Sequence, residues 1–377
     1  MSSRKPLVSV LIDTYNYGRY VEQAIESALG QEFPADEREI LVVDDGSTDD
    51  TAERVRRFGR AITYFRKPNG GQASAFNFGL RYARGKYVAF LDADDYWLAG
   101  KLSRTVEEFE KNPEAGMVYH AYCEWNASKG TFRDGQLPLV SGFLPAEPDE
   151  LLKYVLYPTS FLSFRRSVID LLLPIPEALT IQADAFLSAL AVFVAPIIAI
   201  PDRLAVYRIH SSNLFAGGGK VDSRRRELRM RTRNAFVRTM RTWLDERAYA
   251  LDRPELIELF KQWELTQEGD EFDVVTPSRL KIARHLVRYA SHFKARMTWR
   301  HRAVTYLNAA GSLIVGYKNV PKLEEWRKAI THPFRSRERR REVKMSKSNP
   351  PRWMRIFLHL KETTPTSAKN EYLNLMD

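Results

Sequence analysis

Three carboxylates follow a strand-like apolar run in the first hundred residues of the chain. The run Tyr87–Leu91 leads directly into Asp92, Asp94 and Asp95. Carboxylates at this spacing repel one another, and burying them as ions is unfavourable unless a positive charge compensates them. A divalent cation supplies that charge, and oxygen ligands suit Mg²⁺ or Mn²⁺, which also bind substrate phosphates. A solvated acidic turn is the alternative, because a lone acidic motif has little specificity.

Two earlier strand-like runs end in acidic residues in the same way. The run Glu39–Val43 precedes Asp44 and Asp45, and the run Leu7–Ile12 precedes Asp13. In an open α/β sheet, ligands bind beyond the carboxyl ends of the strands. Three such ends meeting at one edge of a sheet would form a site, whereas a single acidic turn would be unremarkable.

These segments resemble the sequence motifs of the family 2 glycosyltransferases, whose fold is called GT-A. In chain order, the segments that carry the resemblance are Val8–Asn16, Val42–Asp49, Asn69–Gly79 and Phe90–Asp95. The segment Asn69–Gly79 resembles the stretch that passes under the nucleotide in this family. The resemblance covers roughly residues 1–215, and motifs in this order and at this spacing are highly specific. One position departs from the family pattern: many members carry proline where this chain has Asp13, and the additional carboxylate could alter selectivity for the base or the sugar.

The resemblance implies a nucleotide-sugar donor and a divalent metal, Mn²⁺ or Mg²⁺. The residues it assigns to the nucleotide sugar are Thr14, Tyr15, Asn16, Asp45, Gly71, Asn77, Asp92 and Arg208. The residues it assigns to the metal are Asp94, Asp95 and His210. Arg208 and His210 belong to a Tyr-Arg-x-His pattern that closes over the donor phosphates in this family, and guanidinium groups suit phosphate oxygens. A cap on the last core strand is the alternative reading of that pattern.

Asp184 stands at the start of an otherwise apolar helical segment. It could serve as a helix cap or as a partner of the helix dipole. The resemblance assigns it a different role, that of the general base. An inverting transfer needs one carboxylate to deprotonate the acceptor hydroxyl as that hydroxyl attacks the anomeric carbon. Many relatives have a second acid just before this one, where this chain has Ala183.

The apolar residues between the strand-like runs recur at helical spacing, in segments 21–29, 52–58 and 98–109. Alternating strands and helices predict parallel strands joined by right-handed crossovers. We therefore expect an α/β fold with a mostly parallel, Rossmann-like sheet flanked by helices. The apolar segment 185–200 predicts a buried helix followed by a short strand. The glycine- and proline-rich stretch beyond Ser128 predicts a loop region on the acceptor side.

Composition agrees with a globular enzyme. The chain has 377 residues, of which 44% are hydrophobic, and this length suggests two domains. Its single cysteine, Cys123, excludes an internal disulfide framework and is typical of a reducing compartment. We find neither an apolar signal segment nor a stretch of transmembrane length, and therefore expect a cytoplasmic protein.

The charge distribution divides the chain into a catalytic domain, 1–215, and a helical basic region, 216–377. Their formal net charges are −5 and +16. Basic residues alternate with apolar ones in Lys281–Tyr289 and Arg352–Leu360, a pattern that predicts binding to an anionic membrane surface at the cytoplasmic face. The alternative is a helical bundle that packs on the catalytic domain. The run Arg335–Arg341 could suggest nucleic acid, which we disfavour because the region has no recognisable nucleic-acid-binding motif.

We therefore expect a metal-dependent inverting glycosyltransferase that uses a UDP-sugar and acts on a saccharide or lipid-linked acceptor, in the synthesis of a surface polysaccharide. One alternative is a metal-dependent nucleotidyltransferase. Such an enzyme would carry a glycine-rich, basic phosphate loop after the first strand, where this chain has the segment Asp13–Tyr20. Another alternative is a non-catalytic membrane- or nucleic-acid-binding protein with a decayed transferase domain. The intact acids at all three strand ends argue against decay.

Overall fold

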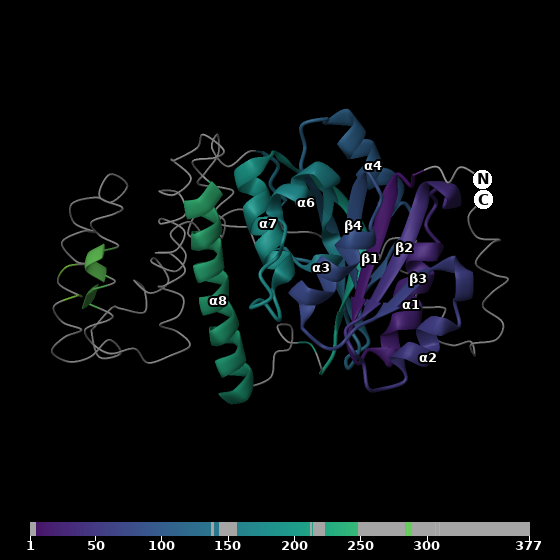
Figure 1. Cartoon of the computed structure of the whole chain (residues 1–377), viewed down its shortest axis with the longest axis horizontal. Helices are drawn as coiled ribbons and strands as arrows, with labels where there is room; N and C mark the ends of the chain where they lie inside the picture. The colour runs from purple at the N-terminus through teal and green to yellow at the C-terminus, as the bar shows by residue number, and fades with distance from the viewer. Residues whose placement is uncertain are drawn as a thin grey trace, which may run out of the picture.

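The computed structural model describes residues 5–136, 139–142, 157–211, 213 and 223–247, and a few positions between 283 and 309. Within these residues the chain forms a nine-stranded sheet flanked by helices (Figure 1). The strands are β1 Val8–Thr14, β2 Arg38–Asp44, β3 Thr63–Arg66, β4 Tyr87–Asp92, β5 Tyr96–Trp97, β6 Met117–Asn126, β7 Thr131–Asp134, β8 Ser163–Arg165 and β9 Ile197–Ile209. The helices are α1 Gly18–Leu29, α2 Thr51–Arg56, α3 Gln72–Tyr82, α4 Lys101–Lys111, α6 Arg166–Leu172, α7 Ala183–Val194 and α8 Ser223–Arg247. Short 3₁₀ turns are η1 Ala35–Glu37, η2 Gly59–Ala61 and η3 Thr159–Phe161.

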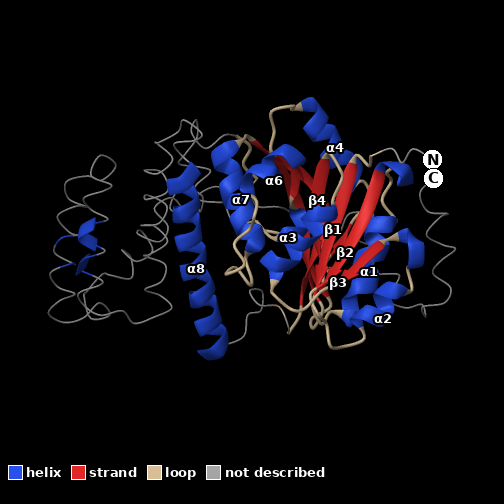
Figure 2. Ribbon diagram, in the orientation of Figure 1, coloured by secondary structure: helices blue, strands red, loops and turns tan. Residues whose placement is uncertain are grey.

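The sheet has the strand order β3-β2-β1-β4-β8-β6-β9-β5, with β7 paired to β6. Its first four strands are mutually parallel, and β6 and β9 form a second parallel pair. The short antiparallel strand β8 joins the two parallel parts. The predicted α/β fold is therefore confirmed, with β1 at the centre of the parallel half (Figure 2).

Alternate side chains of β1 enter two different hydrophobic clusters. Val10 and Ile12 pack with α1, α2 and α4, whereas Leu11 packs with α3, α6 and α7. Both faces of the strand are thus buried, as expected for a parallel sheet covered by helices on both sides. Each large apolar side chain buried in this way contributes about 1.5–3 kcal/mol of transfer free energy. The two layers of helices hold the strand ends in fixed positions.

The predicted strands and helices are present, and two segments differ from expectation. The strand after the buried helix α7 is long rather than short, because β9 runs over 13 residues beside β6 and closes the sheet with β5. The stretch beyond Ser128 begins with strand β7, which pairs with β6, so it is not wholly a loop. Residues 143–156 of that stretch lie outside the described residues.

The described part of the basic region is mainly helix α8, which lies beside α7 (Figure 1). Phe236, Met240, Trp243 and Leu244 bury one side of α8 in the same cluster as α7. The boundary at residue 216 and the runs Arg335–Arg341 and Arg352–Leu360 lie outside the described residues, whereas five residues of Lys281–Tyr289 are described and are helical. Among the described helices, none combines the length and apolar character needed to cross a bilayer.

Candidate active site

The carboxyl ends of β2, β1 and β4 lie side by side at one edge of the sheet. In the strand register, Thr14 of β1 is level with Asp44 of β2, and Asp13 of β1 is level with Asp92 of β4. The predicted convergence of the three acidic strand ends is therefore confirmed. It arises because parallel neighbouring strands present their carboxyl ends to the same edge.

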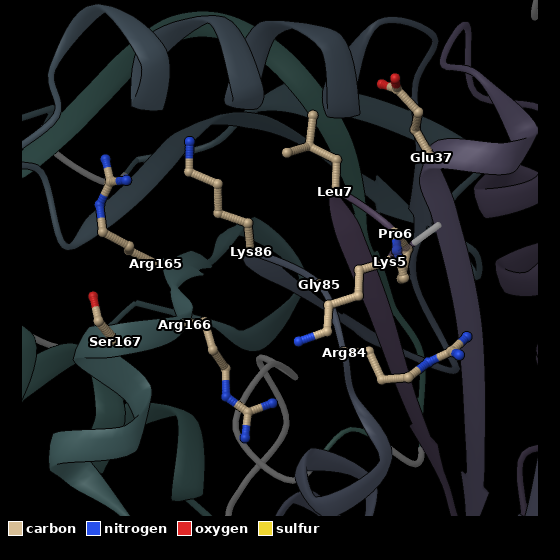
Figure 3. A pocket seen from close by; sticks show the side chains of 10 residues that line it. All are labelled: Lys5, Pro6, Leu7, Glu37, Arg84, Gly85, Lys86, Arg165, Arg166 and Ser167. Carbon is tan, nitrogen blue, oxygen red and sulfur yellow. The ribbon is translucent and has the colours of Figure 1, made fainter. Parts of the chain in front are cut away.

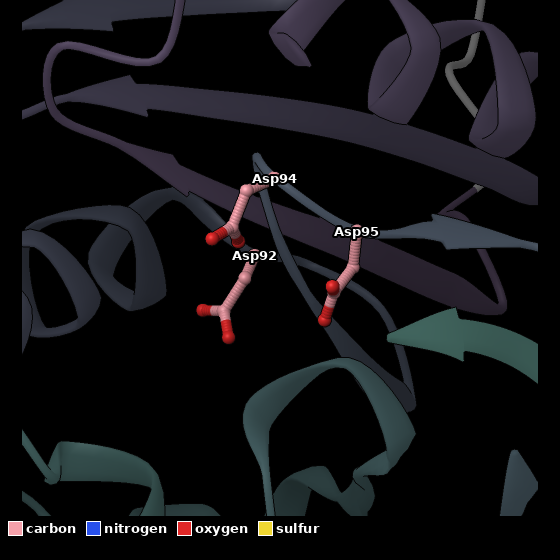
Figure 4. Close-up of side chains that lie close together, drawn as sticks. All are labelled: Asp92, Asp94 and Asp95. Carbon is pink, nitrogen blue, oxygen red and sulfur yellow. The ribbon is translucent and has the colours of Figure 1, made fainter. Parts of the chain in front are cut away.

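Asp92, Asp94 and Asp95 each place one carboxylate oxygen within 4.8 Å of the others (Figure 4). Burial, followed by repulsion from neighbouring carboxylates, raises the pKa of Asp92 and of Asp95 well above the usual value. Oxygen donors at this spacing, held where ionisation is unfavourable, fit a hard divalent cation such as Mg²⁺ or Mn²⁺. Two of the predicted metal residues, Asp94 and Asp95, thus form with Asp92 a cluster whose oxygen atoms suit such an ion, and metal binding there stays a prediction.

Asp95 is the most enclosed member of the cluster, with no exposed surface. The Ser160 hydroxyl donates to one of its carboxylate oxygens at 2.6 Å, and the Arg208 backbone N–H donates to the other at 2.8 Å. Both oxygens are thus already engaged by protein donors. The geometry favours Asp92 and Asp94 as the pair that would hold a metal, with Asp95 anchoring the turn that carries them.

His210 lies against Asp94, as its assignment to the metal site predicts. Its Nε2 is 3.0 Å from Oδ2 of Asp94, and Asn213 donates to the same oxygen at 3.3 Å. The imidazole ring also stacks on the Tyr20 ring, with 4.8 Å between ring centroids. These contacts orient Asp94, and direct metal coordination by His210 stays a prediction.

Arg208 is directed into the protein in this structure. Its Nε donates to the backbone carbonyl of Asp94 at 2.7 Å, and its Nη2 donates to Gln23 at 2.5 Å. The guanidinium also lies over the rings of Tyr20 and Tyr96. Arg208 therefore links the acidic turn to α1 through these two hydrogen bonds. Its contact with donor phosphates stays a prediction.

Three successive residues after β1 have different environments. Thr14 is buried, and its Oγ1 has no hydrogen-bond partner among the described residues. Asn16 has a φ of 58°, and its side-chain oxygen accepts from the Thr48 N–H at 2.7 Å, so it ties the β1 loop to the β2 loop. Tyr15 is 45% exposed at the sheet edge. Of the three, Tyr15 has the aromatic surface open to a ligand.

Asp45 is enclosed by the loop before α3. Lys67 Nζ donates to its carboxylate at 2.6 Å, and the N–H groups of Gly70 and Gly71 donate to it at 3.0 and 2.7 Å. Gly71 has a φ of 84°, and a Cβ there would lie 2.6 Å from the Thr180 Cα, so only glycine fits this position. Asp45 and Gly71 therefore bind one another here, and their nucleotide-binding roles stay predictions.

Asn77 is buried on α3. Its amide donates to the carbonyl of Ile175 at 2.6 Å and accepts from the N–H of the same residue at 2.9 Å. These paired bonds fix the chain segment that leads to α7. They give Asn77 a structural role in this structure, and its contact with the nucleotide sugar stays a prediction.

Asp184 lies in the first turn of α7, as predicted. Its Oδ2 accepts from the N–H and from the hydroxyl of Thr159, both at 3.1 Å, and its Oδ1 accepts from the Ala185 N–H at 2.7 Å. Burial raises the pKa of Asp184 above the usual value, although these hydrogen bonds oppose the rise. Its charge also raises the pKa of Asp13 and Asp92. The candidate base therefore interacts electrostatically with the acidic cluster.

Sequence reasoning missed the two residues that connect the candidate base to the cluster. Thr159 binds Asp184, and its neighbour Ser160 binds Asp95 and also accepts from the Asp92 N–H at 3.1 Å. Both lie in η3 and are fully buried. Ser160 and Asp95 are 65 positions apart in the chain, so no local sequence pattern could have paired them.

Asp13, the departure from the family pattern, faces Asp92 across the β1–β4 pair. Burial is the main cause that raises its pKa to about 7, and one of its oxygens lacks a partner among the described residues. The folded state thus holds the proton more tightly than the unfolded chain does. This stabilisation is complete below the ordinary pKa of 3.8 and is lost as the pH rises through about 7.

We therefore expect Asp13→Asn to raise the melting temperature at pH 8 in the presence of chelator, and to change it little near pH 4. Thermal unfolding of the wild type and of Asp13→Asn between pH 4 and pH 8 measures the difference in melting temperature. Because the other titrating groups are the same in both proteins, this difference reports Asp13. An equal difference at pH 4 and pH 8 would show that Asp13 does not titrate in this way.

A second, basic pocket of about 600 Å³ lies at the amino-terminal end of the same strands, opposite the acidic edge (Figure 3). Three of its cationic side chains are paired with acids, Arg84 with Glu39, Lys86 with Glu110 and Arg166 with Asp170. Arg165, also in the lining, instead donates to backbone carbonyls of the α4–β6 connection. These pairings compensate most of the positive charge of the pocket, and the Lys86–Glu110 pair joins the residue before β4 to α4.

Comparisons with known proteins bear on the family and the fold of the chain. Residues 9–172 match the model of glycosyl transferase family 2. An uncharacterized glycosyltransferase of Nostoc sp. is 36% identical over 219 residues, which are 55% of this chain and 66% of that protein. The hyaluronan synthase of Pasteurella multocida is 37% identical over 120 residues, 31% of this chain and 12% of the synthase. The chain thus spans less than two thirds of both curated relatives.

A crystal structure of S. aureus TarS 1-349 superposes with a TM-score of 0.58 at 18% identity, covering 85% of this chain and 91% of that one. This likeness shows a shared GT-A fold. The segment 9–172 of the chain belongs to glycosyl transferase family 2.

Proposed function

We propose that this chain is an inverting, metal-dependent glycosyltransferase that moves a sugar from a nucleotide-diphosphate donor to a saccharide or lipid-linked acceptor. The observation that carries the proposal is that the carboxylate cluster, which includes Asp92 and Asp94, lies near a second buried carboxylate, Asp184. Consecutive residues connect the two groups: Thr159 donates to the candidate base Asp184, and Ser160 binds Asp95 and the Asp92 N–H of the acidic cluster. Relatives named hyaluronan synthase and chondroitin synthase support a role in polysaccharide synthesis.

In the proposed reaction, the Asp184 carboxylate takes the proton of an acceptor hydroxyl. The acceptor oxygen then bonds to the anomeric carbon from the side opposite the diphosphate, and the bond from that carbon to the phosphate oxygen breaks. The anomeric configuration inverts, and no covalent enzyme intermediate is needed. A divalent ion held by Asp92 and Asp94 would offset the charge of the departing diphosphate. The Tyr15 ring, which is exposed, would stack on the nucleobase.

A binding screen tests the donor class. The purified chain is titrated calorimetrically with UDP, GDP and dTDP, each with Mn²⁺, with Mg²⁺ and with chelator. We expect UDP to bind most tightly, and only with metal. Tightest binding of GDP or dTDP would change the donor and leave the glycosyltransferase proposal intact. A lack of binding by all three nucleotides with either metal would contradict the proposal.

We further propose that the basic region 216–377 binds an anionic membrane surface. Its formal net charge is +16, and Arg238 and Arg241 are exposed on α8, whose apolar side packs on α7. Each Lys or Arg near an anionic leaflet contributes on the order of 1 kcal/mol, and salt screens that attraction. The region would then hold the catalytic domain near lipid-linked acceptors.

We expect the full chain to co-sediment with vesicles that contain phosphatidylserine, and to be released steeply as salt is raised. Vesicles of phosphatidylcholine alone should bind little. A chain that ends at Phe334 should bind the anionic vesicles more weakly and bind nucleotide equally well. If the chain binds neither type of vesicle, the basic region instead packs on the catalytic domain or binds a protein partner.

A further inference from the structure

Thr159 makes two hydrogen bonds to a single oxygen of the candidate base. Its N–H and its hydroxyl both donate to Asp184 Oδ2, each at 3.1 Å. A carboxylate oxygen has two lone pairs, so Oδ2 is fully used by Thr159. The other oxygen, Oδ1, accepts one bond among the described residues, from the Ala185 N–H at 2.7 Å, which leaves it a second lone pair. The two oxygens of Asp184 are therefore not equivalent.

The direction of the Thr159 hydroxyl is fixed by Gln72. The Gln72 amide N–H donates to Thr159 Oγ1 at 3.2 Å, which leaves the hydroxyl proton free to point to Asp184. The side-chain oxygen of Gln72 accepts from the Ala183 N–H at 2.9 Å, at the start of α7. Gln72 thus ties Thr159 and the first turn of α7 together, and the hydroxyl acts as a donor to the carboxylate.

We propose that Thr159 is a positioning residue that holds the Asp184 carboxylate so that Oδ1 receives the acceptor proton. This inference rests on the proposed function, in which Asp184 is the general base. It extends that function by naming the proton-accepting atom and the residue that presents it. Gln72 supports Thr159 in this arrangement.

The hydroxyl of Thr159 also favours the ionised form of Asp184, because it donates to the charged oxygen. Burial opposes ionisation of Asp184. The neighbouring carboxyls Asp13 of β1 and Asp92 of β4 oppose it as well, because they interact unfavourably with its charge. Tyr207 of β9 also faces this region, and carboxylates including Asp184 help to raise its pKa. Removing the hydroxyl should therefore make Asp184 harder to ionise, while the Thr159 N–H keeps the backbone contact.

The direct test is ¹³C NMR of the full chain with labelled aspartate carboxyls, in chelator. The resonance that disappears in Asp184→Asn reports Asp184. In Thr159→Val, a near-isosteric change, we expect its titration midpoint to rise by about one to two pH units, the shift expected for loss of one bond to a charged group. Thr159→Ser should restore the wild-type midpoint. Thr105→Val, at a buried threonine whose hydroxyl has no partner among the described residues, is the matched control.

The second readout is the pH dependence of turnover, measured as nucleotide release from whichever UDP-, GDP- or dTDP-sugar binds. The acid limb should move upward in Thr159→Val by the same amount as the NMR midpoint. Gln72→Met should shift both in the same direction by less, and this keeps the test valid if Thr159→Val fails to fold. An unchanged midpoint in the folded variants would overturn the role of Thr159. A shifted midpoint in a chain that turns over no nucleotide sugar would instead refute the proposed function alone.

Discussion

Asp94→Asn is expected to lower the affinity for nucleotide in the presence of Mn²⁺ by at least about 10²-fold, since even residues that support metal ligands change affinity by 10- to 100-fold. The reason is the place of Asp94 in the carboxylate cluster, where His210 and Asn213 orient it. An amide is a weaker metal ligand than a carboxylate and carries no charge. Excess chelator should reproduce the effect in the wild-type protein and abolish turnover in both.

The matched control for this experiment is Asp50→Asn. Asp50 lies at the same edge of the sheet, but it is exposed and pairs with Arg54 at 2.8 Å rather than with the cluster. We expect Asp50→Asn to bind nucleotide and metal as the wild type does. The circular dichroism spectrum of Asp94→Asn should match the wild type, because the change removes a like charge from a repelling group. Full turnover in excess chelator would refute the metal hypothesis.

Asp184→Asn is expected to lower turnover by about 10²-fold or more, the scale of general-base catalysis. Nucleotide affinity should stay nearly unchanged, because Asp184 is assigned to the acceptor side. Asparagine preserves the shape of the side chain and can still accept from Thr159. Calorimetry with the donor nucleotide and initial rates of nucleotide release, measured on the same preparation, separate binding from chemistry.

Asp170→Asn provides the control for this second experiment, because Asp170 is an exposed acid on α6 that pairs with Arg166. It should leave both turnover and nucleotide affinity unchanged. If Asp184→Asn instead strongly weakens nucleotide binding and leaves turnover at saturating donor unchanged, then Asp184 belongs to the donor site and another group is the base.

The sequence by itself determined the class of fold and the location of the site. Apolar runs such as Tyr87–Leu91 have the length and composition of buried strands, and helical periodicity separates them. Parallel strands with helical crossovers must present their carboxyl ends to one edge. For this reason the meeting of Asp13, Asp44 and Asp92 could be predicted before any contact was known. The position of Asp184 at the start of a buried helix followed from the same local rules.

Only the tertiary structure decided which atoms of these residues are free to act. Asp95 and Asp45 look alike in the sequence, because each directly follows another aspartate near a strand end. In the structure, Ser160 and Arg208 donate to the Asp95 carboxylate. The Lys67–Gly71 loop donates to the Asp45 carboxylate. Hydrogen bonds between residues far apart in the chain depend on how η3, α3 and α7 pack, and no local pattern encodes that packing. The connection of Thr159 to Asp184 is of this kind, since it exists only because η3 is buried between β4 and the start of α7. Local sequence therefore specifies strands, helices and the residues at their ends, whereas long-range packing specifies the partners of each polar atom.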